Sequence, residues 1–301
     1  TRMTDAPQAR TVVLPEKEPD RVKWVVTALV VALVLWSAYD IDAKWSRLID
    51  APADLYTLFR LMFTNIDFSD TRDLLGSMWE SISIAWLGTI IAAVFAVPLS
   101  FLAAENLVGK PIAFLFRQVL NILRAIPEVI LALIFIPVLG LSPMAGVLAI
   151  GIGSIGSLGK LFYEILEAIK TDPLEAADAV GASGLQRLRW GVLPQVMPEL
   201  ASFILYRFEI NIRASAVLGV VGAGGIGADI QQALLFDDYG TAGLGMIIIV
   251  IGTITVDTIS GAVRRRIING PDRAVDDVGD RDPFEMLTPE ARAAATKFGA
   301  T

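Results

Sequence analysis

The sequence predicts an all-α membrane protein, a polytopic bundle of about six transmembrane helices. Apolar residues make up 54% of the chain and charged residues 19%. The mean hydropathy is +0.60, and long apolar runs recur between residues 24 and 263. Soluble domains are about one quarter charged and just under half apolar. This composition therefore indicates a chain that faces lipid.

The predicted spans follow from the apolar runs, because crossing about 30 Å of hydrocarbon takes about 20 helical residues. Six runs qualify, at residues 24–39, 82–104, 120–139, 144–166, 200–221 and 244–263. They imply a tail at 1–22, a first helix at 23–40, an external segment at 41–76, a main transmembrane domain at 77–266 and a second tail at 267–301. The external segment contains Leu55, Leu58, Phe59 and Met62 at helical spacing, which predicts an amphipathic helix at the interface or against an external partner.

The distribution of Lys and Arg predicts the orientation of the spans. These residues gather in segments that six spans place on one side, among them Arg21, Lys23, Lys110, Arg117, Lys170, Arg187, Arg189 and Arg264 to Arg266. The opposite segments are acidic or neutral. Because basic residues favour the cytoplasmic side, both termini are predicted to lie in the cytoplasm.

Several function classes are excluded by composition. The chain has neither His nor Cys, which removes the commonest general base, thiol chemistry and most zinc or haem sites. We therefore predict no catalytic, cofactor-binding or metal-ligating residue. A net charge of −7 gives no electrostatic case for nucleic acid.

A glycine-rich stretch, "VLGVVGAGGIGADI" at 217–230, matches the G-x-G-x-x-G dinucleotide pattern. That motif needs a preceding strand, and here a predicted span precedes it. The pattern occurs again at Gly151, Gly153 and Gly156, where helix packing explains it. We expect a broken, close-packed and flexible outer end of the fifth helix, built on Gly219, Gly222, Gly224, Gly225 and Gly227.

The segment between the fourth and fifth spans, "TDPLEAADAVGASGLQRLRWGVLPQVMPEL", predicts two short helices on the cytoplasmic side. Asp172 is expected to cap the first helix, and Gly181 to end it. Ser183 is expected to cap a second helix that runs through Trp190, before Pro194 starts the next span. Such a rigid projection suits docking into another protein.

This segment, at about 171–194, resembles the EAA loop of ABC-importer permeases. The residues in register are Pro173, Glu175, Ala176, Ala177, Gly181, Leu193 and Pro194, while Gly191 stands where a branched apolar residue is expected. Over roughly 76–266 the chain looks like the permease subunit of phosphonate importers, whose near relatives carry phosphate or phosphite. The methionine-permease type shares the loop and the glycine-rich helix end, so another small solute is an alternative.

The resemblance implies a type I importer with a methionine-permease-like core in a prokaryotic cytoplasmic membrane. A second permease copy, two cytoplasmic ATPase subunits and an external phosphonate- or phosphate-binding protein would complete it. ATP and Mg²⁺ would bind the ATPase subunits, and this chain would be a transport subunit rather than an enzyme. Glu175 would face the ATPase or hold the loop's shape, Ala176 and Ala177 would permit close approach, and Gly181 and Pro194 would set the bend and the re-entry angle.

Charged residues inside the spans are functional candidates, because charge at membrane depth is costly. They are Arg124, Glu128, Arg207, Glu209, Arg213 and Asp257. Arg124 with Glu128, and Glu209 with Arg213, are four residues apart and are expected to share a helix face. Arg213, with Arg124 as a second candidate, would line a path for an oxyanion; otherwise the charges form structural salt bridges.

Two other classes compete with the importer. A secondary anion transporter working alone would use the intramembrane charges as a relay, but no internal repeat supports it. A membrane-embedded enzyme would need a polar catalytic cluster that a chain without His or Cys hardly supplies.

Overall fold

The computed structural model describes residues 21–41 and 47–269, and these form helices without a strand. The tails predicted at 1–22 and 267–301 lie mainly outside the described residues. The chain divides into two compact units, residues 1–57 and 58–301. The all-helical prediction is confirmed for the described residues.

The first unit contains α1 (Arg21–Asp40), which is long and apolar enough to cross a membrane and has no buried residue. It confirms the first predicted span. The helix α2 (Arg47–Thr64) begins in this unit and confirms the predicted amphipathic helix. Its last turns belong to the second unit, where Met62 is buried and packs with Ala233 and Ala242.

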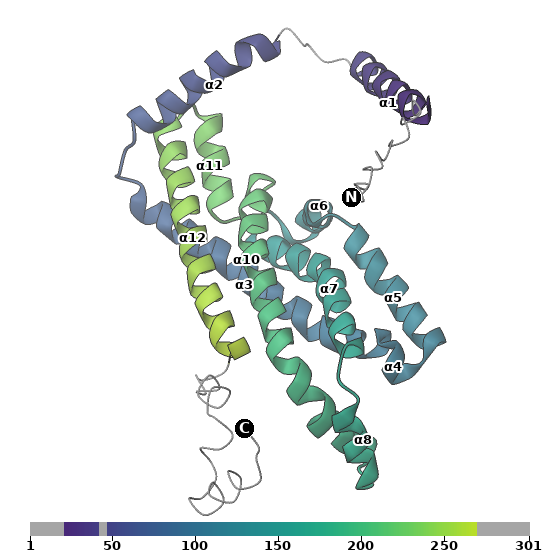
Figure 1. Ribbon diagram of the computed structural model, residues 1–301. Helices are drawn as coiled ribbons and strands as arrows, with labels where there is room; N and C mark the ends of the chain where they lie inside the picture. The colour runs from purple at the N-terminus through teal and green to yellow at the C-terminus, as the bar shows by residue number, and fades with distance from the viewer. Residues whose placement is uncertain (1–20, 42–46, 270–301) are drawn as a thin grey trace, which may run out of the picture. The chain divides into compact units, whose positions relative to one another are not determined.

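The second unit is a bundle in which α10 packs against α3, α7 and α12 (Figure 1). Its elements are α3 (Thr71–Ala103), α4 (Glu105–Val108), α5 (Lys110–Ala125), α6 (Glu128–Leu139), α7 (Pro143–Glu167), α8 (Asp172–Ala179), α9 (Gly184–Arg187), the π-helical turn η1 (Leu188–Val192), α10 (Leu193–Val220), α11 (Ile226–Leu235) and α12 (Tyr239–Asn269).

Every predicted span corresponds to helical structure, with differences in extent and composition. Within the described ranges, α1, α3, α7 and α12 are long and apolar enough to cross a membrane, and the bent pair α5 and α6 makes a fifth span if counted as one. The helix α10 is long enough, but Arg207, Glu209 and Arg213 interrupt its apolar sequence. The helix α3 begins at Thr71, well before the predicted start at 82.

The prediction of one continuous helix over 120–139 is wrong. The helices α5 and α6 meet at a bend of 77°. Pro127 has no N–H to donate, and its ring disfavours helical geometry at the residue before it. Ile126 accordingly has extended backbone angles. Arg124 and Glu128 therefore lie on different helices and do not share a face.

The helix α7 is the central packing element, and its glycines permit that position. A Cβ at Gly156 would meet the Leu120 carbonyl oxygen and the Arg124 backbone nitrogen, the latter at 2.6 Å. A Cβ at Gly153 would lie 2.6 Å from Cγ of Glu128. These distances are shorter than real contacts, so only glycine lets α5 and α6 approach α7 this closely. The packing interpretation of these glycines is confirmed.

The carboxylate of Glu167, at the end of α7, connects the start of α4 to the middle of α5. It accepts a hydrogen bond from the Glu105 N–H at 2.7 Å and pairs with Arg117. Arg117 also donates to the Ala103 carbonyl at 2.9 Å. Because α8 follows α7 directly, this polar cluster anchors the base from which the predicted docking segment projects.

A glycine-to-alanine pair tests the central position of α7. Gly156→Ala should lower the stability of the detergent-solubilised protein by about 1 kcal/mol or more, because overpacking exceeds the helix propensity gained. Gly76→Ala is the matched control, since a Cβ there meets nothing within 4 Å. It should leave the thermal unfolding midpoint unchanged or raise it. Equal midpoints for the two variants would contradict the packing described for α7.

Candidate functional site

The segment between α7 and α10 contains two short helices joined at Gly181, as predicted. Gly181 has a φ of +73°. Its N–H donates to the Asp178 carbonyl, and the Ala182 N–H donates to the Ala177 carbonyl, both at 3.0 Å. This is the Schellman arrangement that closes a helix at a left-handed residue. The bend is therefore held by the backbone itself.

The second short helix has the predicted Ser183 cap. The Ser183 side chain accepts from the Gln186 N–H, and the Gln186 side chain accepts from the Ser183 N–H at 2.8 Å. Arg187 then pairs with Asp178 at 3.2 Å, which ties α9 to α8. The predicted cap of α8 is wrong: Thr171 occupies the cap position without a side-chain bond, and Asp172 is the first helical residue.

The end predicted for the second helix at Trp190 is also wrong. The chain continues from α9 through η1 into α10 without a break. Pro194 cannot donate a backbone hydrogen bond, and a widened turn just before it accommodates that loss. Gln195 reinforces the junction, because its side chain accepts from the Lys170 N–H at 3.0 Å and donates to the Gly191 carbonyl at 2.6 Å. The two short helices are thus joined to α10 by continuous helical backbone and by these side-chain bonds.

A groove lies between α8 and α9, with a volume of about 640 Å³. Its small residues leave room, and the exposed Trp190 forms part of its wall. Its lining consists of Ala176, Ala177, Val180, Gly181, Ala182, Gln186 and Trp190. We call it the α8–α9 groove. The remaining candidates of this segment lie outside the lining, with Pro173, Glu175 and Pro194 exposed and Leu193 half-buried.

A polar network crosses the middle of the bundle. Glu128 of α6 pairs with Arg207 of α10. Arg207 Nε donates to Ser154 Oγ of α7 at 3.0 Å, and that hydroxyl donates to Asn211 Oδ1 at 3.3 Å. Asn211 Nδ2 donates to Thr89 Oγ1 of α3 at 2.8 Å. One hydrogen-bonded chain thus joins four helices at a depth where unpaired polar groups are costly.

Sequence reasoning identified Glu128 and Arg207 but missed Ser154, Asn211 and Thr89. These uncharged polar residues stand in apolar runs and give no charge signal. The available signal was the spacing of Arg207 and Asn211, four residues apart and so on one face of α10. The structure assigns Arg207 and Glu128 to an interhelical salt bridge, the structural alternative stated for the intramembrane charges.

The expected pairing of Glu209 with Arg213 is wrong. Glu209 is 8% exposed and pairs with Arg264 of α12, whose guanidinium lies 5.9 Å from the ring centre of Tyr206. On the same face of α12, Asp257 Oδ1 is buried without a hydrogen-bond partner in the described part of the chain. Glu209 therefore fastens α10 to α12, and Arg213 is left exposed.

The glycine-rich stretch forms a tight turn between α10 and α11. Gly222, Gly224 and Gly225 all have positive φ, and a Cβ at Gly227 would overlap the Ala216 carbonyl. The Ile226 N–H donates to Ser81 Oγ of α3 at 3.0 Å. A helix precedes the glycines where the dinucleotide motif needs a strand. The predicted break and close packing are confirmed, and its flexibility stays a prediction.

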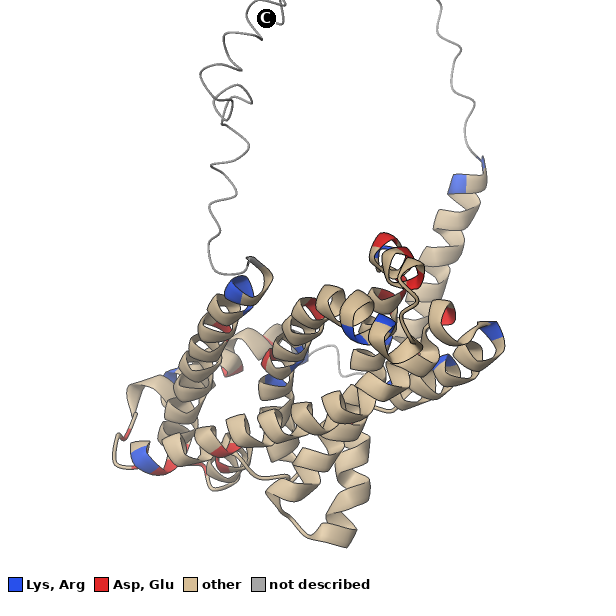
Figure 2. Cartoon of the chain, turned by 90° about the horizontal axis from the view of Figure 1, so that it is seen from below, with Lys and Arg blue, Asp and Glu red and all other residues tan. Residues whose placement is uncertain are grey.

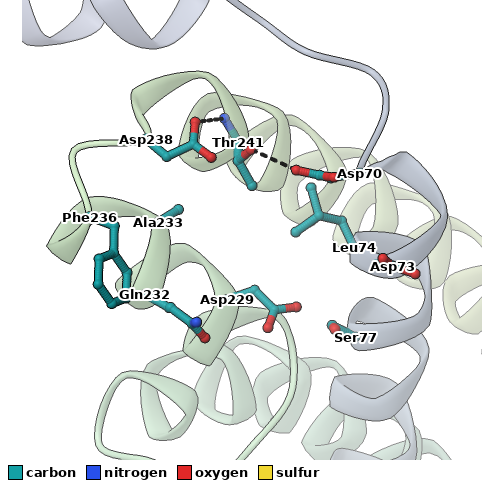
Figure 3. A pocket seen from close by; sticks show the side chains of 10 residues that line it. All are labelled: Asp70, Asp73, Leu74, Ser77, Asp229, Gln232, Ala233, Phe236, Asp238 and Thr241. Carbon is teal, nitrogen blue, oxygen red and sulfur yellow. Dashed lines mark hydrogen bonds between the residues drawn. The ribbon is translucent and has the colours of Figure 1, made fainter.

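An acidic pocket of about 430 Å³ lies where α3, α11 and α12 meet (Figure 3). Asp70, Asp73, Asp229 and Asp238 line it. Thr241 donates through its N–H to Asp238 at 3.1 Å and through its hydroxyl to Asp70 at 3.0 Å. In the described ranges no three His, Cys, Asp or Glu residues, these aspartates included, are arranged so that they could hold one metal ion. Its negative charge makes this pocket a poor site for an anion.

The groove and the acidic pocket lie at opposite ends of the second unit. Figure 1 shows α8 at the lower end and α11 at the upper end. The helix α3 begins beside the pocket and ends beside α7, and its 33 residues span about 50 Å. Seen from below, most of the helical ribbon carries no charge (Figure 2). The second unit therefore has the dimensions of a membrane-crossing bundle with a distinct surface at each end.

This arrangement is that of a helical transport component. The chain belongs to the family described as binding-protein-dependent transport system inner membrane component, whose model matches residues 96–269.

Two relatives and one solved structure show how far the similarity extends. The chain is 40% identical over 200 residues to the phosphite transport system permease protein PtxC of Stutzerimonas stutzeri, covering 66% of this chain and 73% of that one. It is 36% identical over 197 residues to the phosphate-import permease protein PhnE of Mycolicibacterium smegmatis, covering 65% of this chain but 37% of that one. The MetNI methionine ABC transporter in an inward-facing conformation gives a TM-score of 0.60 at 20% identity, covering 67% of this chain and 99% of that chain.

The Glu128–Arg207 pair can be tested by a double-variant cycle. Glu128→Gln and Arg207→Gln should each lower the free energy of unfolding by about 3 kcal/mol, because each leaves a buried charge unpaired. The double variant should cost clearly less than the sum of the two. The measurement is denaturant unfolding in detergent.

The control cycle uses Lys160 and Glu164, a half-exposed pair 3.6 Å apart on α7. Its coupling energy should be about 0.5 kcal/mol or less. Additive effects at Glu128 and Arg207 would show that their contact does not hold α6 to α10.

Proposed function

We propose that this chain is the permease subunit of an ATP-driven importer, coupled to cytoplasmic ATPase subunits through the α8–α9 groove. The observation that carries the proposal is the unbroken connection of α9 through η1 to α10. A partner that seats in the groove and moves α8 and α9 would shift α10, which carries Arg207, Glu209 and Arg213. The resemblance of this segment to the EAA loop supports the same assignment.

In the segment between α7 and α10, some residues would contact the ATPase subunit and others would set the shape of the backbone. Ala176 and Ala177 keep the groove open for close approach. Gly181 fixes the bend, and Pro194 with Gln195 fixes the angle at which α10 leaves. Glu175 is exposed in the first turn of α8 and is available to the ATPase. ATP and Mg²⁺ would bind the ATPase subunits, and we assign no cofactor to this chain.

The substrate class we propose is a small phosphorus oxyanion, namely phosphonate, phosphite or phosphate, delivered by an external binding protein. The phosphite and phosphate transport named for the two relatives supports it, and arginine at membrane depth suits an oxyanion. The likeness to the methionine transporter is a likeness of fold, which makes methionine the weaker alternative. A secondary transporter working alone would leave the α8–α9 groove without a role.

The complete assembly would contain two copies of this chain, two ATPase subunits and the binding protein. Both termini and the groove would lie in the cytoplasm, and the acidic pocket would lie on the outer face. One bundle lines only one side of a translocation path, and a second copy of the chain would line the other side.

A groove-filling variant tests the coupling. Ala177→Trp should abolish the stimulation of ATP hydrolysis by phosphite-, phosphonate- or phosphate-loaded binding protein in proteoliposomes, because the indole would occupy the space needed for close approach. We expect a fall of about tenfold or more, to the unstimulated rate, with unchanged membrane insertion.

The matched control is Ala179→Trp, on the same helix but outside the groove lining, which should keep the stimulation. A methionine-loaded binding protein should not stimulate ATP hydrolysis by the wild-type complex. The coupling proposal fails if both tryptophan variants behave alike. The substrate proposal fails if methionine alone stimulates the wild-type complex.

A further inference from the structure

Arg213 lies on a narrow exposed stripe of α10. The stripe consists of Tyr206, Arg213, Val217 and Val220, all exposed. Their spacing of seven, four and three residues puts them on one face of the helix. Within the stripe Arg213 supplies the only charge, because the neighbouring Arg207 and Glu209 point into the bundle; the exposed Glu199 lies on the same face but about two turns before Tyr206. The stripe is thus an otherwise apolar surface with one cation in it.

The depth of Arg213 follows from the polar network. Asn211 is bonded to Thr89, which stands near the middle of α3 (Thr71–Ala103). Arg213 is two residues further along α10, which displaces it by about 3 Å along the helix axis. Arg213 of α10 therefore lies about level with the middle of α3, the longest helix of the described bundle.

The other arginines at membrane depth are compensated in the described part of the chain. Arg207 pairs with Glu128, and Arg264 pairs with Glu209. Arg124 is also exposed without an ion pair, but it stands in the last turn of α5, where the carbonyl end of a helix favours a cation. Arg213 lies within α10 and has no acidic side chain in ion-pair contact among the described residues. Its neighbour Glu209, four residues before it, is engaged by Arg264.

An uncompensated arginine near the middle of a membrane does not face lipid, because the cost of burying its charge in hydrocarbon is large. The stripe of α10 must therefore face water or another protein surface. A water-filled path between two copies of the chain meets this requirement. In such a path the guanidinium keeps its hydration and its donors stay available.

We propose that Arg213 contacts the phosphorus oxyanion as the anion crosses the membrane. This inference rests on the proposed function and adds a substrate-contacting residue to that function. The guanidinium presents parallel N–H donors that match two oxygens of a phosphonate, phosphite or phosphate group. A single exposed arginine gives a contact that is weak enough to release the anion, as a transport path requires. Two copies of the chain would supply one Arg213 from each wall.

The experiment measures ATP-dependent uptake of labelled phosphate, phosphite or methylphosphonate into proteoliposomes that contain the complete complex. Arg213→Gln should lower the uptake rate about tenfold or more, since it removes a charge-assisted contact. Arg213→Lys keeps the charge without the fork and should retain an intermediate rate. Arg266→Gln removes the same charge at the exposed end of α12 and should leave uptake within about twofold. ATP hydrolysis without substrate verifies that each variant is assembled.

The outcomes separate this inference from the function on which it rests. Wild-type uptake that is absent for all three anions contradicts the proposed function. Wild-type uptake that Arg213→Gln leaves unchanged contradicts only the role of Arg213. Equal losses in Arg213→Gln and Arg213→Lys, together with loss of unstimulated ATP hydrolysis, indicate a structural position and also overturn the inference.

Discussion

The close approach of neighbouring helices to the glycine face of α7 is the constraint on which the bundle depends. Gly156 admits the backbone of α5, and Gly153 admits the side chain of Glu128. That approach brings Glu128 within reach of Arg207 and Ser154 within hydrogen-bond distance of Arg207 and Asn211 on α10. Without it the polar groups of four helices would be buried without partners. The close packing on α7 is therefore also what allows the buried polar groups of the bundle to find hydrogen-bond and ion-pair partners.

Two interhelical salt bridges, Glu128–Arg207 and Glu209–Arg264, hold one face of α10 against the bundle and leave another face exposed. Arg207 and Glu209 hold α10 to α6 and α12, while Arg213 lies on the exposed stripe. At its start α10 continues directly from η1, with Gln195 bracing the junction. One helix thus connects the α8–α9 groove at one end of the bundle to an exposed cation near its middle. This connection gives the proposed coupling a physical route.

Composition and apolar run length were enough to predict the helical class and to place helical structure at each of the six runs, because a segment that crosses lipid must be helical and apolar. The bend at Gly181 and the Ser183 cap were also predictable, since each depends on nearby residues alone. Pairing was not. Glu128 and Arg124 satisfy the helical spacing rule, yet Pro127 breaks the helix between them. Glu209 and Arg213 share a continuous helix, yet Arg264 from α12 takes the carboxylate. Such choices depend on tertiary proximity, which local spacing does not contain.

The proposed contact between the α8–α9 groove and the ATPase subunits is tested most directly by site-directed cross-linking. The chain contains no cysteine, so single cysteines can be placed freely. Val180→Cys lies in the groove, and Ser77→Cys lies in the acidic pocket at the other end. In the purified complex, a thiol-to-amine cross-linker should join Val180→Cys to an ATPase subunit and leave Ser77→Cys unjoined. Cross-linking from Ser77→Cys, with none from Val180→Cys in an intact complex, would contradict the account.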